Sequence, residues 1–153
     1  MENRYLCRGK MLNENWVCGY LTEKDGMLFI SNKASAPLAY AVQPKTICQC
    51  TGLRDKNGEL IWENDIVDFL GYKGTVVFEC GSFGIAYKTP IDWNGIEANI
   101  KPITGCENLL YACENDNYIS LWEIYWNFND EDNSLNTVEV VGNALDNPEL
   151  LEV

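Results

Sequence analysis

Hydrophobic and polar positions along the chain form short strand-like segments that are separated by turn signals. "NWVCGYL" (15–21) and "MLFISN" (27–32) are rich in aromatic and β-branched residues, and the intervening "EKDG" (23–26) ends in an Asp-Gly pair that tolerates positive φ. "GTVVFEC" (74–80) and "FGIAYK" (83–88) follow at short spacing. Several short strands at such spacing predict a mostly β chain, built as a small barrel of short hairpins with little helix.

The stretch "TGLRDKNGELIWENDIV" (51–67) can be interpreted as an active site or as a hairpin. It contains four carboxylates of the kind that a hydrolase or a metal site uses: Asp55, Glu59, Glu63 and Asp65. Asn57-Gly58, however, is a common turn pair, and a bulge at Gly58 would let the Asp55 carboxylate accept backbone N–H bonds. The apolar positions also change phase around 63–65, which predicts a bend between two strand pieces. We therefore favour the hairpin.

Seven cysteines and the absence of histidine restrict the chemistry further. The N-terminus lacks the continuous apolar stretch of a secretory signal, so we expect reduced cysteines that are buried as small hydrophobic residues. Cys48 and Cys50 form the one closely spaced pair, but a closed zinc site needs four ligands. The loop that starts at Asp130 has Leu135 and Val141 where a calcium loop needs Gly and Glu. We predict no metal site and no cofactor.

Signatures of catalysis are also missing from the sequence. It has no histidine to serve as the base for a cysteine, no glycine-rich phosphate loop and no serine nucleophile elbow. We therefore predict no catalytic residues. An enzyme that uses carboxylates alone stays as an alternative.

Charge is distributed unevenly along the chain. The net charge is −12, yet residues 1–101 hold all 11 basic residues against 12 acids, and residues 102–153 hold 11 acids and no base. Nucleic acid and anionic lipid are bound by clustered Lys and Arg, so we expect neither a nucleic-acid partner nor a membrane. No apolar run is long enough to span a bilayer, and we place the protein in the cytoplasm. A solvated acidic surface is the common explanation of such a charge.

The run "NYISLWEIYWNFNDEDN" (117–133) is unusually aromatic. Alternating large apolar side chains favour a strand over 118–128, and apolar spacings of three and four make a helix the alternative. Core packing is the ordinary interpretation of such aromatics. The alternative is a recognition patch rimmed by acids, Glu123 among them, which is a composition found at protein interfaces. The candidate partner-binding residues are Trp122, Tyr125, Trp126, Asp130, Glu131 and Asp132.

Three blocks of the sequence resemble one known family. They are "RYLCRGKMLNENWVCGYL" (4–21), "TGLRDKNGELIWENDIVDF" (51–69) and "VEVVGNALDNPELLE" (138–152). In this order they are similar to the YopX family, whose members are proteins of phages and prophages. The resemblance implies a mostly β architecture with SH3-like barrel character and no established biochemical activity. We expect a single domain over 1–153, with a longer, aromatic and acidic insertion at about 88–136.

The positions that match the family are mostly of the kind that builds a scaffold, since glycines suit turns and Trp16 suits a core or a platform. Cys18 and Cys50 depart from the pattern, because the resemblance would place tyrosine there. The matching positions are Gly9, Trp16, Gly52, Leu53, Asp55, Asn57, Gly58, Asp65, Ile66, Val67, Gly142, Asn143, Asn147 and Pro148.

Three classes of function are compatible with these features. We favour a non-enzymatic accessory protein of a phage or prophage that binds a host or viral protein in the cytoplasm of a bacterial host. The second class is an acidic decoy that imitates nucleic acid and occupies a DNA- or RNA-binding protein. The carboxylate-only enzyme is third. The sequence does not identify the partner. It is also compatible with a homo-oligomer.

Overall fold

The structure, a computed structural model, describes residues 5–31, 38–79, 81–93, 117–128 and 134–152. The described chain is mostly β, as predicted, and forms two compact units: an N-terminal unit, Met1–Gly52, and a C-terminal unit, Leu53–Val153. A single domain over residues 1–153 stays a prediction. No helix within the described ranges is long and apolar enough to span a membrane.

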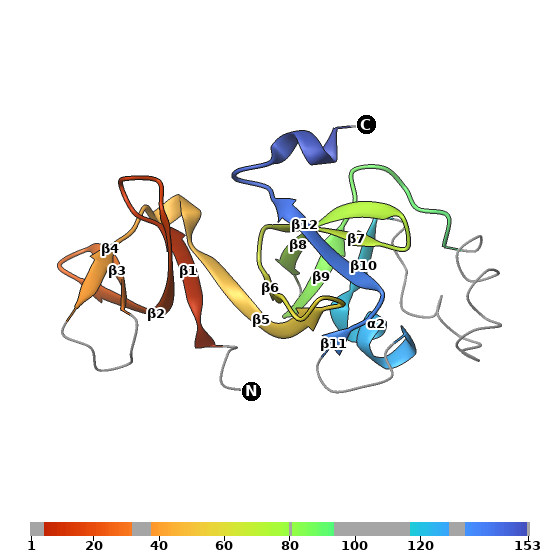
Figure 1. Ribbon diagram of the computed structural model, residues 1–153, viewed down its shortest axis with the longest axis horizontal. Coiled ribbons are helices and arrows are strands. Elements are labelled where there is room, and N and C mark those ends of the chain that lie inside the picture. The colour runs from red at the N-terminus through yellow and green to blue at the C-terminus, as the bar shows by residue number, and fades with distance from the viewer. Residues whose placement is uncertain (1–4, 32–37, 80, 94–116, 129–133, 153) are drawn as a thin grey trace. The chain divides into compact units, whose positions relative to one another are not determined.

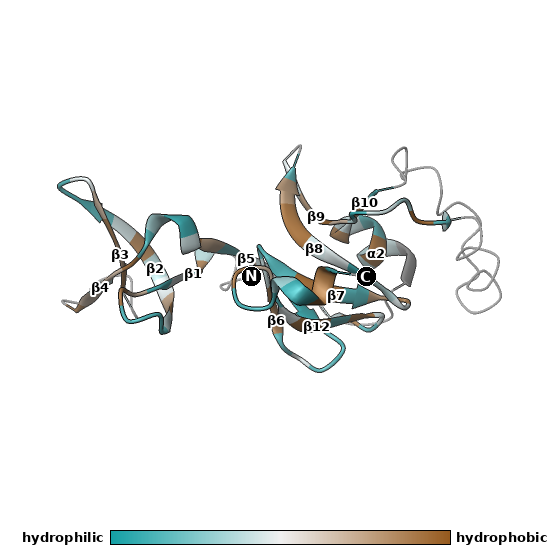
Figure 2. Ribbon diagram, turned by 90° about the horizontal axis from the view of Figure 1, so that it is seen from above, coloured by the Kyte–Doolittle hydropathy of each residue, from teal (hydrophilic) through white to brown (hydrophobic). Residues whose placement is uncertain are grey.

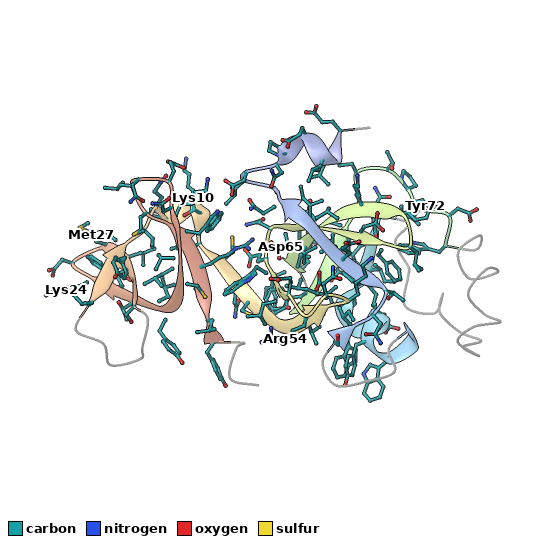
Figure 3. All side chains as sticks on the ribbon, in the orientation of Figure 1. Lys10, Lys24, Met27, Arg54, Asp65 and Tyr72 are labelled. Atoms are coloured by element: carbon teal, nitrogen blue, oxygen red, sulfur yellow. The ribbon has the colours of Figure 1, made fainter. Side chains whose placement is uncertain are left out.

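The N-terminal unit is an antiparallel sheet in the order β5–β1–β2–β3–β4. Its β2–β3 hairpin confirms the predicted turn, because Asp25 and Gly26 both have positive φ, 54° and 78°, as an Asp-Gly turn requires. Lys24 and Met27 pair at the tip of this hairpin, where Figure 3 labels them. The strands are β1 (Cys7–Lys10), β2 (Trp16–Lys24), β3 (Met27–Ser31), β4 (Ala39–Ala41) and the first half of β5 (Cys48–Asp55).

Two cysteines belong to the small core of this unit. Cys48 and Cys50 are buried, which confirms the predicted packing as small hydrophobic residues. The prediction is wrong for Cys18, which is exposed on β2 opposite Arg8. Partial burial raises the pKa of the Cys18 thiol by more than the nearby Arg8 charge lowers it. Three further cysteines lie outside the described residues: Cys80, Cys106 and Cys113.

The C-terminal unit contains a five-stranded antiparallel sheet in the order β10–β9–β8–β7–β12 (Figure 1). The second half of β5 belongs to this unit, where it pairs with β6 and, in parallel, with β11. The strands are β6 (Leu60–Trp62), β7 (Asp65–Phe69), β8 (Tyr72–Glu79), β9 (Ser82–Ala86), β10 (Tyr118–Ser120), β11 (Ser134–Leu135) and β12 (Val138–Asn143). The unit also has a short helix, α2 (Leu121–Phe128), and a 3₁₀ turn, η4 (Pro148–Leu151).

Residues 51–67 form the predicted hairpin and bend. β5 and β6 are joined by a turn in which Gly58 has φ of 81°, a conformation that costs glycine little. The bend between β6 and β7 is at Asn64, whose φ is 68°. Asparagine tolerates this region better than most residues, so the predicted change of phase at 63–65 is confirmed.

The core of the C-terminal unit is a continuous apolar cluster that receives side chains from every strand between β6 and β12 and from α2. Brown, hydrophobic segments follow β8 in Figure 2. Neither sheet closes on itself within the described residues, so a mostly β fold is shown and a barrel is not. The fully buried side chains include Ile61, Phe69, Ile85, Ile124 and Leu135.

Candidate functional site

Helix α2 carries three aromatic side chains that pack against one another at the surface. Trp122 and Trp126 are 59% and 64% exposed, and Tyr125 is half-buried. The ring centroids of Trp122 and Trp126 are 5.4 Å apart, with their planes at 80°, and Tyr125 lies 5.8 Å from Trp126 at 82°. Trp122 and Tyr125 are nearly parallel, at 18° and 5.9 Å. We call Trp122, Tyr125 and Trp126 the aromatic face.

The opposite side of α2 fixes the helix to the core. Leu121 and Ile124 are 1% and 0% exposed, and their spacing of three places both on one side of a helix. The helix begins after Ser120, whose Oγ accepts the N–H of Trp122 at 3.1 Å and so caps the first turn. The aromatic face is therefore held by a short, anchored element.

The strand prediction for 118–128 is confirmed only for β10 and is wrong from Leu121 onward. In a run where nearly every residue is apolar or aromatic, a period of two and a period of three to four fit almost equally well. The spacing of Leu121 and Ile124, with Ser120 before them, is the signal that could have found the helix.

Core packing, the ordinary interpretation of this run, is also wrong for two of its tryptophans. Trp122 and Trp126 face solvent, whereas Leu121 and Ile124 supply the buried contacts. Three of the six predicted partner-binding residues thus meet on one helix. The other three lie outside the described residues: Asp130, Glu131 and Asp132.

The surroundings of the aromatic face are poor in positive charge. α2 and the strands packed against it, β9, β10 and β11, contain no Lys or Arg. The C-terminal unit as a whole has 19 acids and 5 bases, a net charge of −14, whereas the N-terminal unit has 4 acids and 6 bases. Glu123 adds a half-buried acid to the helix itself.

Two of the four acids of residues 51–67, Asp55 and Asp65, accept hydrogen bonds from backbone N–H groups. The fully buried Asp55 carboxylate accepts three backbone N–H groups, each at 2.9 Å, from Asn57 and Glu59 in its own turn and from Val140 on β12. Asp65, which is also buried and is labelled in Figure 3, accepts the N–H of Trp62 at 2.8 Å across the bend. Both carboxylates are therefore structural, as the hairpin interpretation predicts.

Glu63 gives a test of this interpretation that depends on pH. It is half-buried in the bend, and burial raises the pKa of its carboxyl above the ordinary value of 4.5. A carboxyl with a raised folded pKa imposes no penalty while it is protonated and its full penalty once it is ionised, so its contribution to stability falls as pH rises through that pKa. We expect Glu63→Gln to raise the melting temperature slightly at neutral pH and to leave it unchanged below pH 4.5.

Glu139 is the matched control, because the pKa of its carboxyl is shifted in the opposite direction. Its carboxylate accepts a 2.7 Å hydrogen bond from Lys56, which lowers its pKa, so its contribution is present at neutral pH and lost on acidification. Glu139→Gln should therefore lower the melting temperature at neutral pH, by a small amount because the pair is exposed. Melting curves of both variants from acid to neutral pH make the comparison; equal trends for the two would contradict it.

A hollow of about 420 Å³ lies elsewhere in the C-terminal unit. Its lining combines two tyrosines, Tyr72 and Tyr87, and Lys73 with leucines of η4, and it contains none of the predicted site residues. Within the described ranges, no three Cys, Asp or Glu side chains lie close enough to hold a metal ion. The aromatic face is thus the stronger candidate.

The family model described as YopX protein matches residues 7–152, nearly the whole chain. The chain belongs to the YopX family. No curated protein matches it.

In this YopX family member, the sequence blocks that resemble the family build strands and the turns that join them. Asp55 and Gly58 shape the β5–β6 turn, and Asn143 closes the end of β12 by accepting the N–H groups of Leu145 and Asp146 at 3.1 and 2.9 Å. The aromatic face lies outside those blocks. The three blocks therefore account for scaffold, and α2 lies between them, within the residues that the family model matches.

Proposed function

We propose that this YopX family member is a non-enzymatic accessory protein of a phage or prophage, which acts in the cytoplasm of a bacterial host by binding a protein through its aromatic face. The observation that carries the proposal is the exposure of Trp122 and Trp126 on a helix whose other side is buried. Large side chains of this kind are the commonest energetic anchors of protein interfaces. A contiguous exposed apolar patch on a soluble protein marks an interaction site.

The partner should present a positively charged surface. A unit with a net charge of −14 attracts basic surfaces over a Debye length of about 8 Å at physiological salt and repels acidic ones. The same charge favours a second candidate, the decoy that occupies a nucleic-acid-binding protein, because such proteins present basic clefts. On this alternative the partner would release its DNA or RNA when it binds.

SH3-like barrel character is the finer description of the fold that we propose. The short strands that contribute side chains to one apolar cluster, with tight turns between several of them, support it. Such a scaffold has no need of a catalytic centre, and the carboxylate-only enzyme stays the least favoured alternative.

The test compares Trp122→Ala/Trp126→Ala with the parent. A partner captured from host lysate by the parent is purified, and its Kd is measured by calorimetry with both proteins. We expect the double variant to bind at least about tenfold more weakly, since loss of a hot-spot aromatic typically costs about 2 kcal/mol or more.

Phe78→Ala is the matched control. Phe78 is also an aromatic residue of the C-terminal unit, 51% exposed, and it packs against Phe83 on β9. It should bind as the parent does. If the Trp122→Ala/Trp126→Ala variant binds the partner with the parent's Kd, the aromatic face is not the docking surface.

A further inference from the structure

We infer that the aromatic face recognises a cationic side chain, arginine or lysine, that projects from a basic segment of the partner protein. The inference rests on the proposed function and names the chemistry of the contact. Aromatic rings attract cations placed over their faces within about 6 Å of the centroid, and tryptophan does so best.

The geometry of the three rings suits one cation. Trp126 lies at 80° to Trp122 and at 82° to Tyr125, and the centroids are 5.4 and 5.8 Å apart. Two ring planes at right angles form a corner, so a single charge in that corner is close to the faces of both. The contacts among the rings also limit their rotation, so little side-chain entropy is lost when a cation binds.

The chain contains an internal example of the same interaction. In the N-terminal unit, the guanidinium of Arg8 lies 4.9 Å from the ring centroid of Trp16, and the ammonium of Lys10 lies 5.5 Å from it. Among the described residues no cation lies over Trp122, Tyr125 or Trp126. The two tryptophans of α2 thus have the ring chemistry of Trp16, with no cation from the described ranges placed over them.

Charge favours a basic protein segment over the other surfaces to which exposed tryptophans bind. α2 and the strands packed against it, β9, β10 and β11, supply no Lys or Arg that could occupy the rings. The net charge of −14 repels anionic lipid, which would otherwise be an alternative for amphipathic aromatic residues. A peptide rich in arginine suits the aromatic face in two ways. The negative charge of the unit attracts it at long range, and its planar guanidinium groups stack on the rings at contact.

The experiment uses a fluorescent nona-arginine peptide as the probe and the full chain as the receptor. Trp122→Leu/Trp126→Leu keeps apolar side chains but removes the π-faces, and Phe78→Leu makes the same kind of change on a different element, β8. Binding is measured at about 0.15 M salt and again at about 1 M, where the Debye length falls to about 3 Å. We expect the double variant to bind about tenfold more weakly at both salt concentrations and Phe78→Leu to bind as the parent does.

An uncharged Gly-Ser peptide and the melting curves complete the design. The Gly-Ser peptide should not bind, and the leucine variant should melt with the parent because both replaced side chains are exposed. If it does not fold, the indole N–H signals of the parent are followed by NMR during titration with the probe, and only two of the five tryptophans should shift.

The outcomes separate this inference from the proposed function. If the leucine variant binds nona-arginine as tightly as the parent, or if the shifted indole signals are not those of Trp122 and Trp126, recognition of a cation by these rings is wrong. The protein partner can then still bind the aromatic face by apolar contact, and Trp122→Ala/Trp126→Ala would still weaken it. If the alanine variant keeps its partner while the leucine variant loses nona-arginine, the proposed function fails and the cation site stands.

Discussion

Asp55→Ala should lower the free energy of unfolding by about 3 kcal/mol. The change leaves three backbone N–H groups without their acceptor, two in the β5–β6 turn and one on β12. The three bonds are partly buried, and at about 1 kcal/mol for each N–H group that loses its acceptor the total is a large part of the 5–15 kcal/mol that holds a typical domain together. Urea denaturation followed by tryptophan fluorescence measures the loss.

Asp68→Ala is the control for Asp55→Ala. The Asp68 carboxylate accepts one N–H, from Gly71 at 2.9 Å, and this bond is exposed to water. We expect it to cost less than about 1 kcal/mol, since water replaces the lost acceptor. Equal losses for the two variants would show that Asp55 does not join the turn to β12.

Ile124→Ala should cost about 2–5 kcal/mol, the range for large-to-small changes in a packed core. Its side chain is fully buried on the core side of α2, so truncation removes apolar contacts and leaves a cavity. Thermal and urea unfolding both report this loss. Binding to the partner should weaken only to the extent that α2 unfolds.

Trp122→Ala is the counterpart on the other side of the same helix. We expect it to change stability by less than about 1 kcal/mol, because an exposed side chain makes few contacts that folding depends on. The two variants thus separate stability from binding. A large loss of stability in Trp122→Ala with none in Ile124→Ala would reverse the orientation that we assign to α2.

The hairpins are predictable from the sequence because turn residues act locally. Asp25-Gly26 and Asn57-Gly58 tolerate positive φ wherever they occur, and the structure uses both pairs in this way. The bend at Asn64 follows from the same local chemistry. These features need no knowledge of what packs above or below them.

The tertiary features of the fold and of the aromatic face depend on contacts between distant parts of the chain. A pattern of single residues does not contain those contacts. The local acceptor role of the Asp55 carboxylate can be read from its turn, but its bond to Val140 joins residues 85 positions apart. Whether Trp122 or Leu121 is buried is decided by how β10 pairs with β9 and where α2 then lies, and both are tertiary choices. Sequence reasoning could therefore gather the aromatic residues of the site without saying which of them face the solvent.

Strand β5 has a consequence for how such a protein can evolve. The boundary between the two units falls after Gly52, inside a strand that runs from Cys48 to Asp55. Its first residues pair with β1 and its last with β11, so each unit uses part of one continuous strand. Recombination that joined a gene fragment ending at residue 52 to an unrelated sequence would cut β5 in two. The N-terminal unit would then keep only the first part of that strand. Recombination that preserves the fold has to transfer β5 intact.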